Sequence, residues 1–263
     1  MSWLRRALLF VVAIYLLLCA VMYLLQRRMQ YFPDGGSVSA PAGAEDVTLK
    51  TADGLSIKAT YWVPKRDTTL LIFHGNAGHR GDRFGWVSGF VQDGWGVLLI
   101  DYRGYGGSEG SPTEQGLYKD ADAAAAFLAQ RGAKRVVYFG RSLGAGVAVD
   151  LAARRAPAGL IVECGALAIV DVAKEAYPAF PVGWLMRDRY DGRGKVEKIA
   201  CPGLFIHGAR DTLIPPRMGR ALFDAYGAKK EWYEVEGAGH NDVSLVGGRA
   251  YYRRISDWLE HAR

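Results

Sequence analysis

The pattern of apolar and polar positions divides the chain into one long uncharged stretch followed by many short apolar runs. Residues 7–25 contain no charged side chain, and Arg5, Arg6, Arg27 and Arg28 flank them. As a helix, this stretch would extend about 28 Å, enough to cross the hydrocarbon of a bilayer. We therefore expect an N-terminal transmembrane anchor over residues 1–28.

A cleaved signal peptide is the alternative interpretation of this stretch. Signal peptides have a shorter apolar region, about 7–15 residues, followed by a cleavage site between small residues. The residues from Met22 to Gln26 offer no such site. Arginines flank the stretch equally, and only the free amino terminus favours a cytoplasmic N-terminus, with the rest of the chain outside the cytoplasm.

The region after the anchor begins with a connecting segment and a hairpin. Residues 29–44 are rich in proline and glycine, which is typical of a connection. Residues 47–51 and 55–62 then alternate apolar and polar positions around Asp53 and Gly54, which predicts a β-hairpin. We place the start of the folded domain, residues 45–263, at this hairpin.

From residue 69 onward, short apolar runs alternate with helix-like stretches. Strands are expected at 69–74, 96–101, 135–139, 159–164, 203–207 and 230–235, and helices at 83–92, 113–131, 143–155, 218–226 and 247–261. This alternation predicts an α/β fold with a mostly parallel central sheet and helices on both faces. Residues 165–195 interrupt the alternation and predict a small cap insertion.

Composition and charge narrow the function classes. The net charge is +6 and the pI about 9.2, but the arginines around the anchor supply most of the excess. Because no basic stripe remains, we expect no nucleic-acid partner. No Gly-x-Gly-x-x-Gly follows the first strand and no P-loop, His-Glu-x-x-His or paired-cysteine spacing occurs, so no cofactor and no metal are expected. Cys164 and Cys201 fall at opposite edges of the expected sheet, which predicts free thiols.

Two pentapeptides match the nucleophile motif Gly-x-Ser-x-Gly, one around Ser142 and one around Ser108. The motif works as a sharp turn between a strand and a helix, which exposes the serine oxygen. Ser142 follows a β-branched and aromatic run and precedes an alanine-rich stretch without proline. Ser108 lacks both flanks, because Ser111 and Pro112 follow it. Ser142 is therefore the expected nucleophile, and Ser108 a turn residue.

An acid and a base follow Ser142 in the order that a serine nucleophile needs. Asp211 comes just after the strand expected at 203–207, and His240 lies in a glycine loop after the strand at 230–235. In α/β-hydrolases the order is serine, acid, histidine, each after a strand. We expect Ser142, His240 and Asp211 to form a catalytic triad, with Asp242 as the alternative acid.

Attack on a carbonyl also needs hydrogen-bond donors for the resulting oxyanion. One is expected from the backbone N–H of Leu143, directly after the nucleophile. The other is expected from the Asn76 N–H in His74-Gly75-Asn76-Ala77-Gly78, where glycines allow close approach of the backbone. A plain glycine turn is the alternative for this segment.

With these motifs in place, the chain resembles a membrane-anchored α/β-hydrolase of the ABHD type. The resemblance rests on the segments 74–78, 101–110, 139–144, 207–211 and 239–242, together with the anchor followed by Gln26-Arg27-Arg28 and Tyr31-Phe32-Pro33. This branch includes acyl-protein depalmitoylases and bacterial and fungal relatives. The resemblance implies a serine hydrolase of acyl esters or thioesters, as in esterases, lipases and thioesterases, and makes Ser108 part of a family loop.

The cap offers candidates for substrate binding. Tyr177, Phe180 and Trp184 could form an apolar wall for the acyl chain of a lipid or lipidated protein presented at the membrane. Ordinary packing of a helix-loop cover is the alternative.

Two other functions also remain open from the sequence: a serine peptidase with the same triad, and a non-catalytic membrane-anchored binding protein.

Overall fold

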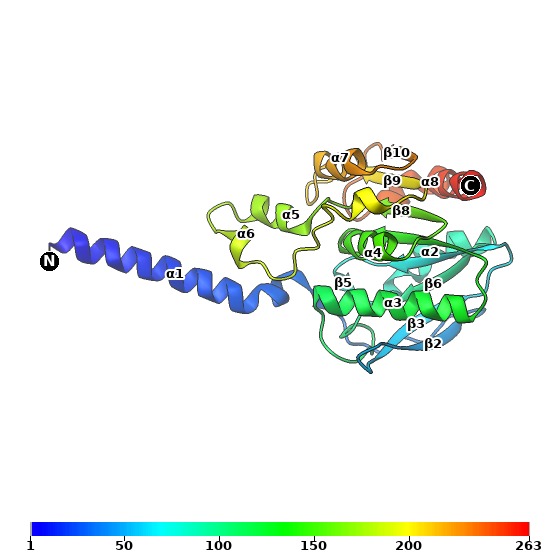
Figure 1. Cartoon of the computed structure of the whole chain (residues 1–263), viewed down its shortest axis with the longest axis horizontal. Helices are drawn as coiled ribbons and strands as arrows, with labels where there is room; N and C mark the ends of the chain where they lie inside the picture. Colours follow the sequence, from blue (N-terminus) through cyan, green and yellow to red (C-terminus); the bar gives the residue numbers. More distant parts are fainter. Residues whose placement is uncertain (1, 263) are drawn as a thin grey trace.

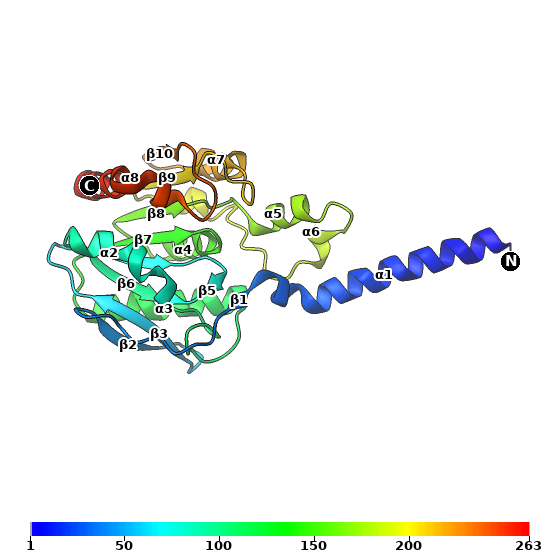
Figure 2. The same cartoon turned by 180° about the vertical axis from the view of Figure 1, so that it is seen from behind.

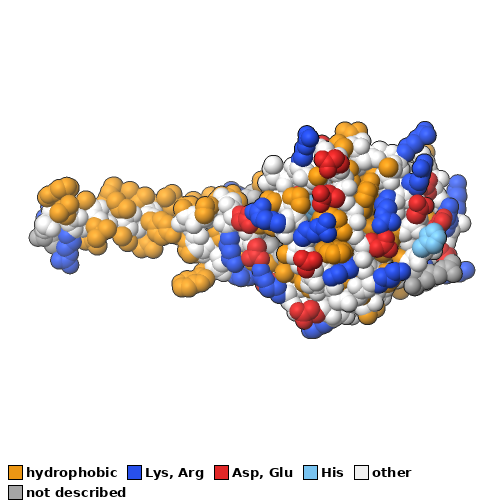
Figure 3. Space-filling view, turned by 90° about the horizontal axis from the view of Figure 1, so that it is seen from above, with side chains coloured by type: hydrophobic (Ala, Val, Ile, Leu, Met, Phe, Trp, Pro, Cys, Tyr) orange, Lys and Arg blue, Asp and Glu red, His pale blue; other side chains and the backbone are white. Residues whose placement is uncertain are grey.

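A computed structural model, which describes residues 2–262, consists of an α/β body and one long helix that projects from it (Figures 1 and 2). The projecting helix is α1, Trp3–Gln30. Its apolar window has a mean hydropathy of 2.9 and is only 6% buried. Figure 3 shows apolar side chains covering this helix, with basic residues at its two ends. By length and composition alone, α1 is able to cross a membrane.

An eight-stranded sheet forms the centre of the body. From one edge to the other, the order is β10 (Lys230–Val235), β9 (Gly203–Gly208), β8 (Gly159–Glu163), β7 (Arg135–Arg141), β4 (Thr68–Phe73), β6 (Gly96–Ile100), β3 (Ser56–Trp62) and β2 (Glu45–Lys50). Neighbours from β10 to β6 are parallel, whereas β3 runs antiparallel to both β6 and β2. The sheet is therefore mostly parallel, as the sequence predicts.

Helices cover both faces because the buried strands are apolar on both sides. The helices are α2 (Phe84–Gln92), α3 (Glu114–Gln130), α4 (Leu143–Arg154), α7 (Pro216–Ala225) and α8 (Val243–His261). Leu71 and Phe73 of β4 pack in the cluster under α3, α4 and α7. Leu70 and Ile72 of the same strand pack on the other face, under α2 and α8. Alternate residues of one strand thus supply two cores.

The connection after α1 is more ordered than a proline- and glycine-rich segment suggests. The helix extends to Gln30, two residues beyond the expected anchor. Tyr31 is buried, and β1 (Phe32–Pro33) pairs in parallel with β5 (Ala77–Gly78). A 3-10 helix, Arg80–Arg83, follows β5. The segment therefore joins α1 directly to the loop that contains Asn76.

The cap lies between α1 and the body (Figures 1 and 2). It contains α5 (Ile169–Ala176) and α6 (Val182–Leu185), and a 3-10 helix, Val196–Lys198, follows it. Cys19, Cys164 and Cys201 are all buried, free thiols.

Helix α8 begins at Val243, earlier than expected, because it continues across a kink at Gly248, where φ is 50°.

Candidate active site

Ser142 occupies the turn between β7 and α4 in a strained conformation. Its φ is 54° and its ψ −119°, a backbone geometry that non-glycine residues rarely adopt. The flanking glycines make the turn possible: a Cβ on Gly144 would lie 2.1 Å from the Phe73 carbonyl oxygen, and one on Gly140 would lie 2.4 Å from that of Gly144. The motif around Ser142 thus has the sharp strand-to-helix turn that its sequence predicts.

The side chains of Ser142, His240 and Asp211 meet at the carboxyl edge of the sheet. The His240 Nε2 atom is 2.9 Å from the Ser142 Oγ, and the His240 Nδ1 atom is 2.7 Å from an Asp211 carboxylate oxygen. A neutral imidazole with its proton on Nδ1 satisfies both contacts, donating to Asp211 and accepting from Ser142. The arrangement is able to remove the serine proton and to stabilise the resulting imidazolium.

The Asp211 carboxylate is buried and held in its ionised form. Burial alone would raise its pKa, but hydrogen bonds from the His207 and His240 rings and from the Ile214 N–H outweigh burial and hold the pKa well below its usual range. The Leu213 N–H also donates to this carboxylate, at 2.9 Å. Asp211 is therefore charged at neutral pH, and its carboxylate is able to accept the His240 N–H.

Asp242, the alternative acid, has a different contact. Its carboxylate accepts the Gly239 N–H at 2.7 Å and so shapes the loop that carries His240. The His240 ring itself contacts Asp211. The geometry favours Asp211 over Asp242 as the partner of the histidine.

The backbone N–H groups of Asn76 and Leu143 are available to a ligand. Within residues 2–262, neither donates to another protein group. Leu143 is the first residue of α4, where N–H groups have no intrahelical acceptor. The next peptide group fixes the backbone of this residue, since the Asn76 carbonyl accepts the Phe32 N–H at 2.9 Å and the Tyr105 hydroxyl at 2.8 Å.

A cavity of about 250 Å³ opens at Ser142. Asn76 and Leu143 line it beside the serine, and the remaining wall is mostly aliphatic and uncharged. Of the three expected wall residues, Tyr177 lines the cavity, but Phe180 and Trp184 do not. Phe180 instead stacks on Tyr15 of α1, and the side chain of Trp184 is 93% exposed.

Part of the cavity wall comes from α1, although the sequence predicts only a membrane anchor over residues 1–28 and a connecting segment from residue 29. Met22, Gln26, Met29 and Gln30 line the cavity. The Gln30 carbonyl also accepts a hydrogen bond from the Asn76 side chain at 3.0 Å. Gln26 and Gln30 are polar residues at the end of an apolar helix, and they are the sequence feature that indicates this packing.

Arg141, beside the nucleophile, was also missed by the sequence interpretation. Its guanidinium lies 3.0 Å from the buried Glu163 carboxylate and donates to the Asn241 carbonyl at 2.9 Å. Glu163 also accepts from the Tyr251 hydroxyl. Because Asn241 follows His240, Arg141 connects the nucleophile turn to the histidine loop.

Curated proteins align with almost the whole chain. An uncharacterised protein of Mycobacterium tuberculosis is 37% identical over 245 residues, which cover 89% of this chain and 87% of the relative. Protein bem46 of Schizosaccharomyces pombe is 30% identical over 94% of this chain and 90% of its own length. The human alpha/beta hydrolase domain-containing protein 17B is 36% identical over 74% of this chain and 67% of its own length. This chain belongs to the ABHD-type α/β-hydrolases.

Family and structural comparisons agree with this assignment. A family model described as "Serine aminopeptidase, S33" matches residues 64–189 of this α/β-hydrolase. An esterase of Pyrococcus furiosus superimposes with a TM-score of 0.75, covering 88% of this chain and 99% of the esterase at 18% identity. An esterase of Exiguobacterium antarcticum has a TM-score of 0.64, covering 82% and 100% of the two chains at 16% identity. At these identities the structural likeness establishes the fold alone.

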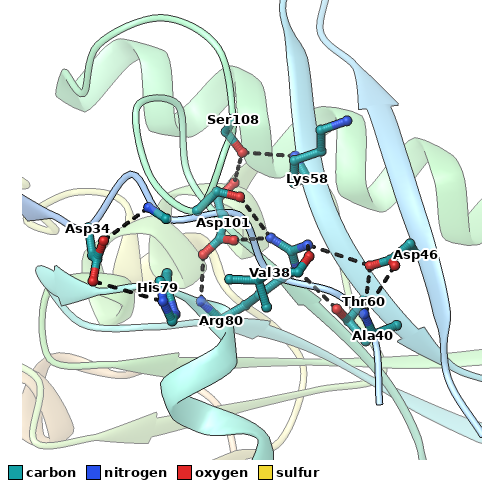
Figure 4. A network of polar contacts seen from close by, with 12 residues as sticks. Asp34, Val38, Ala40, Asp46, Lys58, Thr60, His79, Arg80, Asp101 and Ser108 are labelled. Carbon is teal, nitrogen blue, oxygen red and sulfur yellow. Dashed lines mark hydrogen bonds and ion pairs between the residues drawn. The ribbon is translucent and has the colours of Figure 1, made fainter. Parts of the chain in front are cut away.

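Ser108 and Asp101 of this α/β-hydrolase belong to a buried structural network (Figure 4). The Ser108 hydroxyl accepts the Lys58 N–H at 2.8 Å and lies 3.3 Å from the Asp101 carbonyl. The Asp101 carboxylate forms an ion pair with Arg80, which also donates to Thr60 at 3.0 Å. Ser108 contacts no histidine here, as expected for a turn residue.

Among residues 2–262, one buried cluster has metal-ligating side chains: Cys164, His207 and Asp211. Its donors already have other partners. The His207 Nε2 atom is 2.8 Å from the Ile214 carbonyl, and burial raises the pKa of the Cys164 thiol, which keeps it protonated. The His207 Nε2 atom also lies 3.3 Å from the Asp211 carboxylate, so this histidine supports the acid of the site.

The buried His74 side chain should make the stability of the folded protein sensitive to acid. Burial lowers its pKa to about 4, whereas an unfolded histidine titrates near 6.5. Between these values the unfolded chain binds one proton more than the folded chain, so stability falls as the pH drops from about 6.5 to about 4, by on the order of 1–3 kcal/mol. Urea unfolding across this range should show a steeper pH slope for the native protein than for His74→Gln. Equal slopes would contradict the assignment.

Proposed function

We propose that this α/β-hydrolase is a membrane-anchored serine hydrolase that cleaves carboxylic esters or thioesters of acyl chains. The observation that carries the proposal is the pair of contacts on the His240 ring, 2.9 Å to the Ser142 Oγ and 2.7 Å to Asp211. The residues of α1 provide the anchor, because its length and hydropathy suit a membrane span. Lipid esters and lipidated proteins are the substrate class that such an anchor favours.

In the proposed reaction, His240 Nε2 takes the Ser142 proton while the serine oxygen attacks the substrate carbonyl carbon. The Asn76 and Leu143 N–H groups stabilise the oxyanion. His240 then gives the proton to the leaving oxygen or sulfur, and an acyl-enzyme on Ser142 remains. Water, deprotonated by His240, hydrolyses this ester and restores the serine. Asp211 stays ionised throughout and stabilises the imidazolium.

A serine peptidase is the second candidate, because the matching family model is described as a serine aminopeptidase. An aminopeptidase needs a negatively charged group to bind the free amine of its substrate. Among the described residues that line the cavity, none is charged. The uncharged, mostly aliphatic wall therefore favours an acyl chain over a peptide amino terminus.

A fluorophosphonate probe tests the proposed nucleophile. We expect the full-length protein and Ser108→Ala to be labelled and to hydrolyse p-nitrophenyl butyrate, whereas Ser142→Ala should lose both properties. Ser108 provides a matched control because it occupies the second Gly-x-Ser-x-Gly motif and its hydroxyl is engaged in the network around Asp101. Labelling that survives in Ser142→Ala but not in Ser108→Ala would refute the proposal.

A further inference from the structure

The cap and α1 are joined at the level where the apolar part of α1 ends. The Gln26 side chain donates to the Leu185 carbonyl at 3.2 Å and accepts the Arg187 N–H at 2.7 Å. One residue further along α1, Arg27 forms an ion pair with Asp188 at 2.8 Å. The charged residues that follow α6 in the cap therefore lie at the same level as the arginines that end the membrane helix.

Other cap residues lie alongside α1 much deeper in its apolar part. The Tyr15 hydroxyl donates to the Ala179 carbonyl at 3.1 Å, and its ring stacks on Phe180 with a centroid distance of 6.0 Å. Tyr15 precedes Gln26 by about three helical turns, or roughly 16 Å. Half the hydrocarbon thickness of a bilayer is about 15 Å. If α1 spans a membrane, the loop around Ala179 lies inside the hydrocarbon, close to the midplane of the bilayer.

The composition of this part of the cap suits such a position. Residues 176–186 contain no charged side chain and are bounded by Glu175 and Arg187. Within this run, Trp184 is 93% exposed, which leaves a large and mostly apolar side chain without protein cover. The charges that lie close to this run have polar partners: the Lys174 ammonium pairs with Asp171 at 3.0 Å, and the Arg189 guanidinium donates to the Gly183 carbonyl.

Most of the backbone N–H groups in this run have an acceptor within the cap. Irregular backbone in hydrocarbon must satisfy its own N–H groups. Pro178 and Pro181 have no backbone N–H group to satisfy. Six other residues of the run donate their N–H groups to carbonyls within residues 173–182. These six are Tyr177, Phe180, Val182, Trp184, Leu185 and Met186.

We propose that residues 176–186 of the cap are immersed in the bilayer leaflet next to the body, and that the cavity takes acyl chains sideways from that leaflet. This inference rests on the proposed function, since it requires α1 to span the membrane and Ser142 to be the nucleophile. Met22 and Leu185 line the cavity from the two sides of the proposed entrance. Ser142 lies in the same cavity, so a chain entering between α1 and the cap reaches the serine without crossing water.

Immersion is tested without any catalysis. The full-length protein is placed in phosphatidylcholine vesicles that contain lipids brominated along their acyl chains, and its tryptophan fluorescence is compared with that of Trp184→Phe. We expect the bromolipids to quench the native protein more than the variant, because bromine atoms contact Trp184 only within the hydrocarbon. Equal quenching of the two proteins would overturn the proposal.

Entry from the leaflet is tested with Trp184→Asp. A charge at this position should lower hydrolysis of a long-chain ester dissolved in vesicles roughly tenfold, since charged groups are costly in hydrocarbon. Hydrolysis of soluble p-nitrophenyl butyrate should stay unchanged, because Trp184 does not line the cavity. Val63→Asp is the matched control, because Val63 is also exposed, at 59%. It follows β3 at the end of the sheet opposite to the active site, where Trp62 pairs with Val97.

The outcomes separate the two proposals. Equal effects of Trp184→Asp on the vesicle and the soluble ester, or an equal loss in Val63→Asp, would overturn entry from the leaflet and leave the serine hydrolase intact. A native protein that hydrolyses neither ester would refute the proposed function, while the quenching experiment would still report on the position of the cap.

Discussion

Replacing Asp211 with asparagine should lower kcat about 10⁴-fold, because the substituted amide favours the wrong tautomer of the catalytic histidine. The Asp211 carboxylate accepts from His240 Nδ1 at 2.7 Å and from the N–H groups of Leu213 and Ile214. The Leu213 and Ile214 N–H groups share one carboxylate oxygen and His240 contacts the other, so an asparagine oxygen replaces only one of the two, and its NH₂ group cannot accept the histidine N–H. Hydrolysis of p-nitrophenyl butyrate at saturating substrate measures the change, with thermal unfolding as a check that the variant is folded.

Asp242→Asn is the matched control for this prediction. Asp242 lies in the same loop as His240, but its carboxylate accepts the Gly239 N–H, a contact that an asparagine oxygen preserves. We expect its kcat to stay within a few-fold of the native value, as for a substitution that keeps its hydrogen bond. If kcat fell strongly in Asp242→Asn but only slightly in Asp211→Asn, then Asp242 and not Asp211 would be the acid of the triad.

Asp101→Asn should destabilise the fold by about 3–5 kcal/mol, the usual cost of leaving a buried charge without its partner. Asp101 is fully buried and Arg80 nearly so, and the two form an ion pair (Figure 4). The Arg80 guanidinium also donates to the Val38 and Gly106 carbonyls and lies 3.5 Å from the exposed Asp46 carboxylate, so it stays in place when the buried partner is neutralised. Urea unfolding of the detergent-solubilised protein, followed by tryptophan fluorescence, measures the loss.

Glu45→Gln provides the comparison, because it breaks an ion pair with Arg131 in which both side chains are largely exposed. Such surface pairs contribute about 0–1 kcal/mol. The two variants each remove one negative charge, so they differ in burial and not in net charge. A similar small loss in both variants would contradict the structural role assigned to Asp101.

The order of strands and helices could be predicted from the sequence because buried parallel strands are continuous apolar runs bounded by glycine, proline and polar residues. That order also located Ser142, Asp211 and His240, since each directly follows a strand and the carboxyl ends of parallel strands meet at one edge. The segments that flank the two Gly-x-Ser-x-Gly motifs distinguish Ser142 from Ser108 in the sequence, because only Ser142 stands between a strand and a helix.

The walls of the cavity could not be predicted in the same way. Phe180 and Trp184 were chosen because they are aromatic, but the periodicity of a four-residue helix such as α6 does not identify the side that packs inward. The contribution of α1 was hidden for a related reason: an apolar helix has the same composition whether lipid or protein covers it. Arg141 was missed because its partners, Glu163 and Asn241, are distant in sequence.

The shared surface of α1 and the cap has a practical consequence for obtaining a water-soluble form of this hydrolase. Cutting the chain after Gln30 would delete four of the residues that enclose the substrate chamber and the carbonyl that steadies the Asn76 amide. Such a shortened protein would keep its nucleophile but have an open-sided chamber, and its preference for chain length would describe a different binding site from that of the complete molecule.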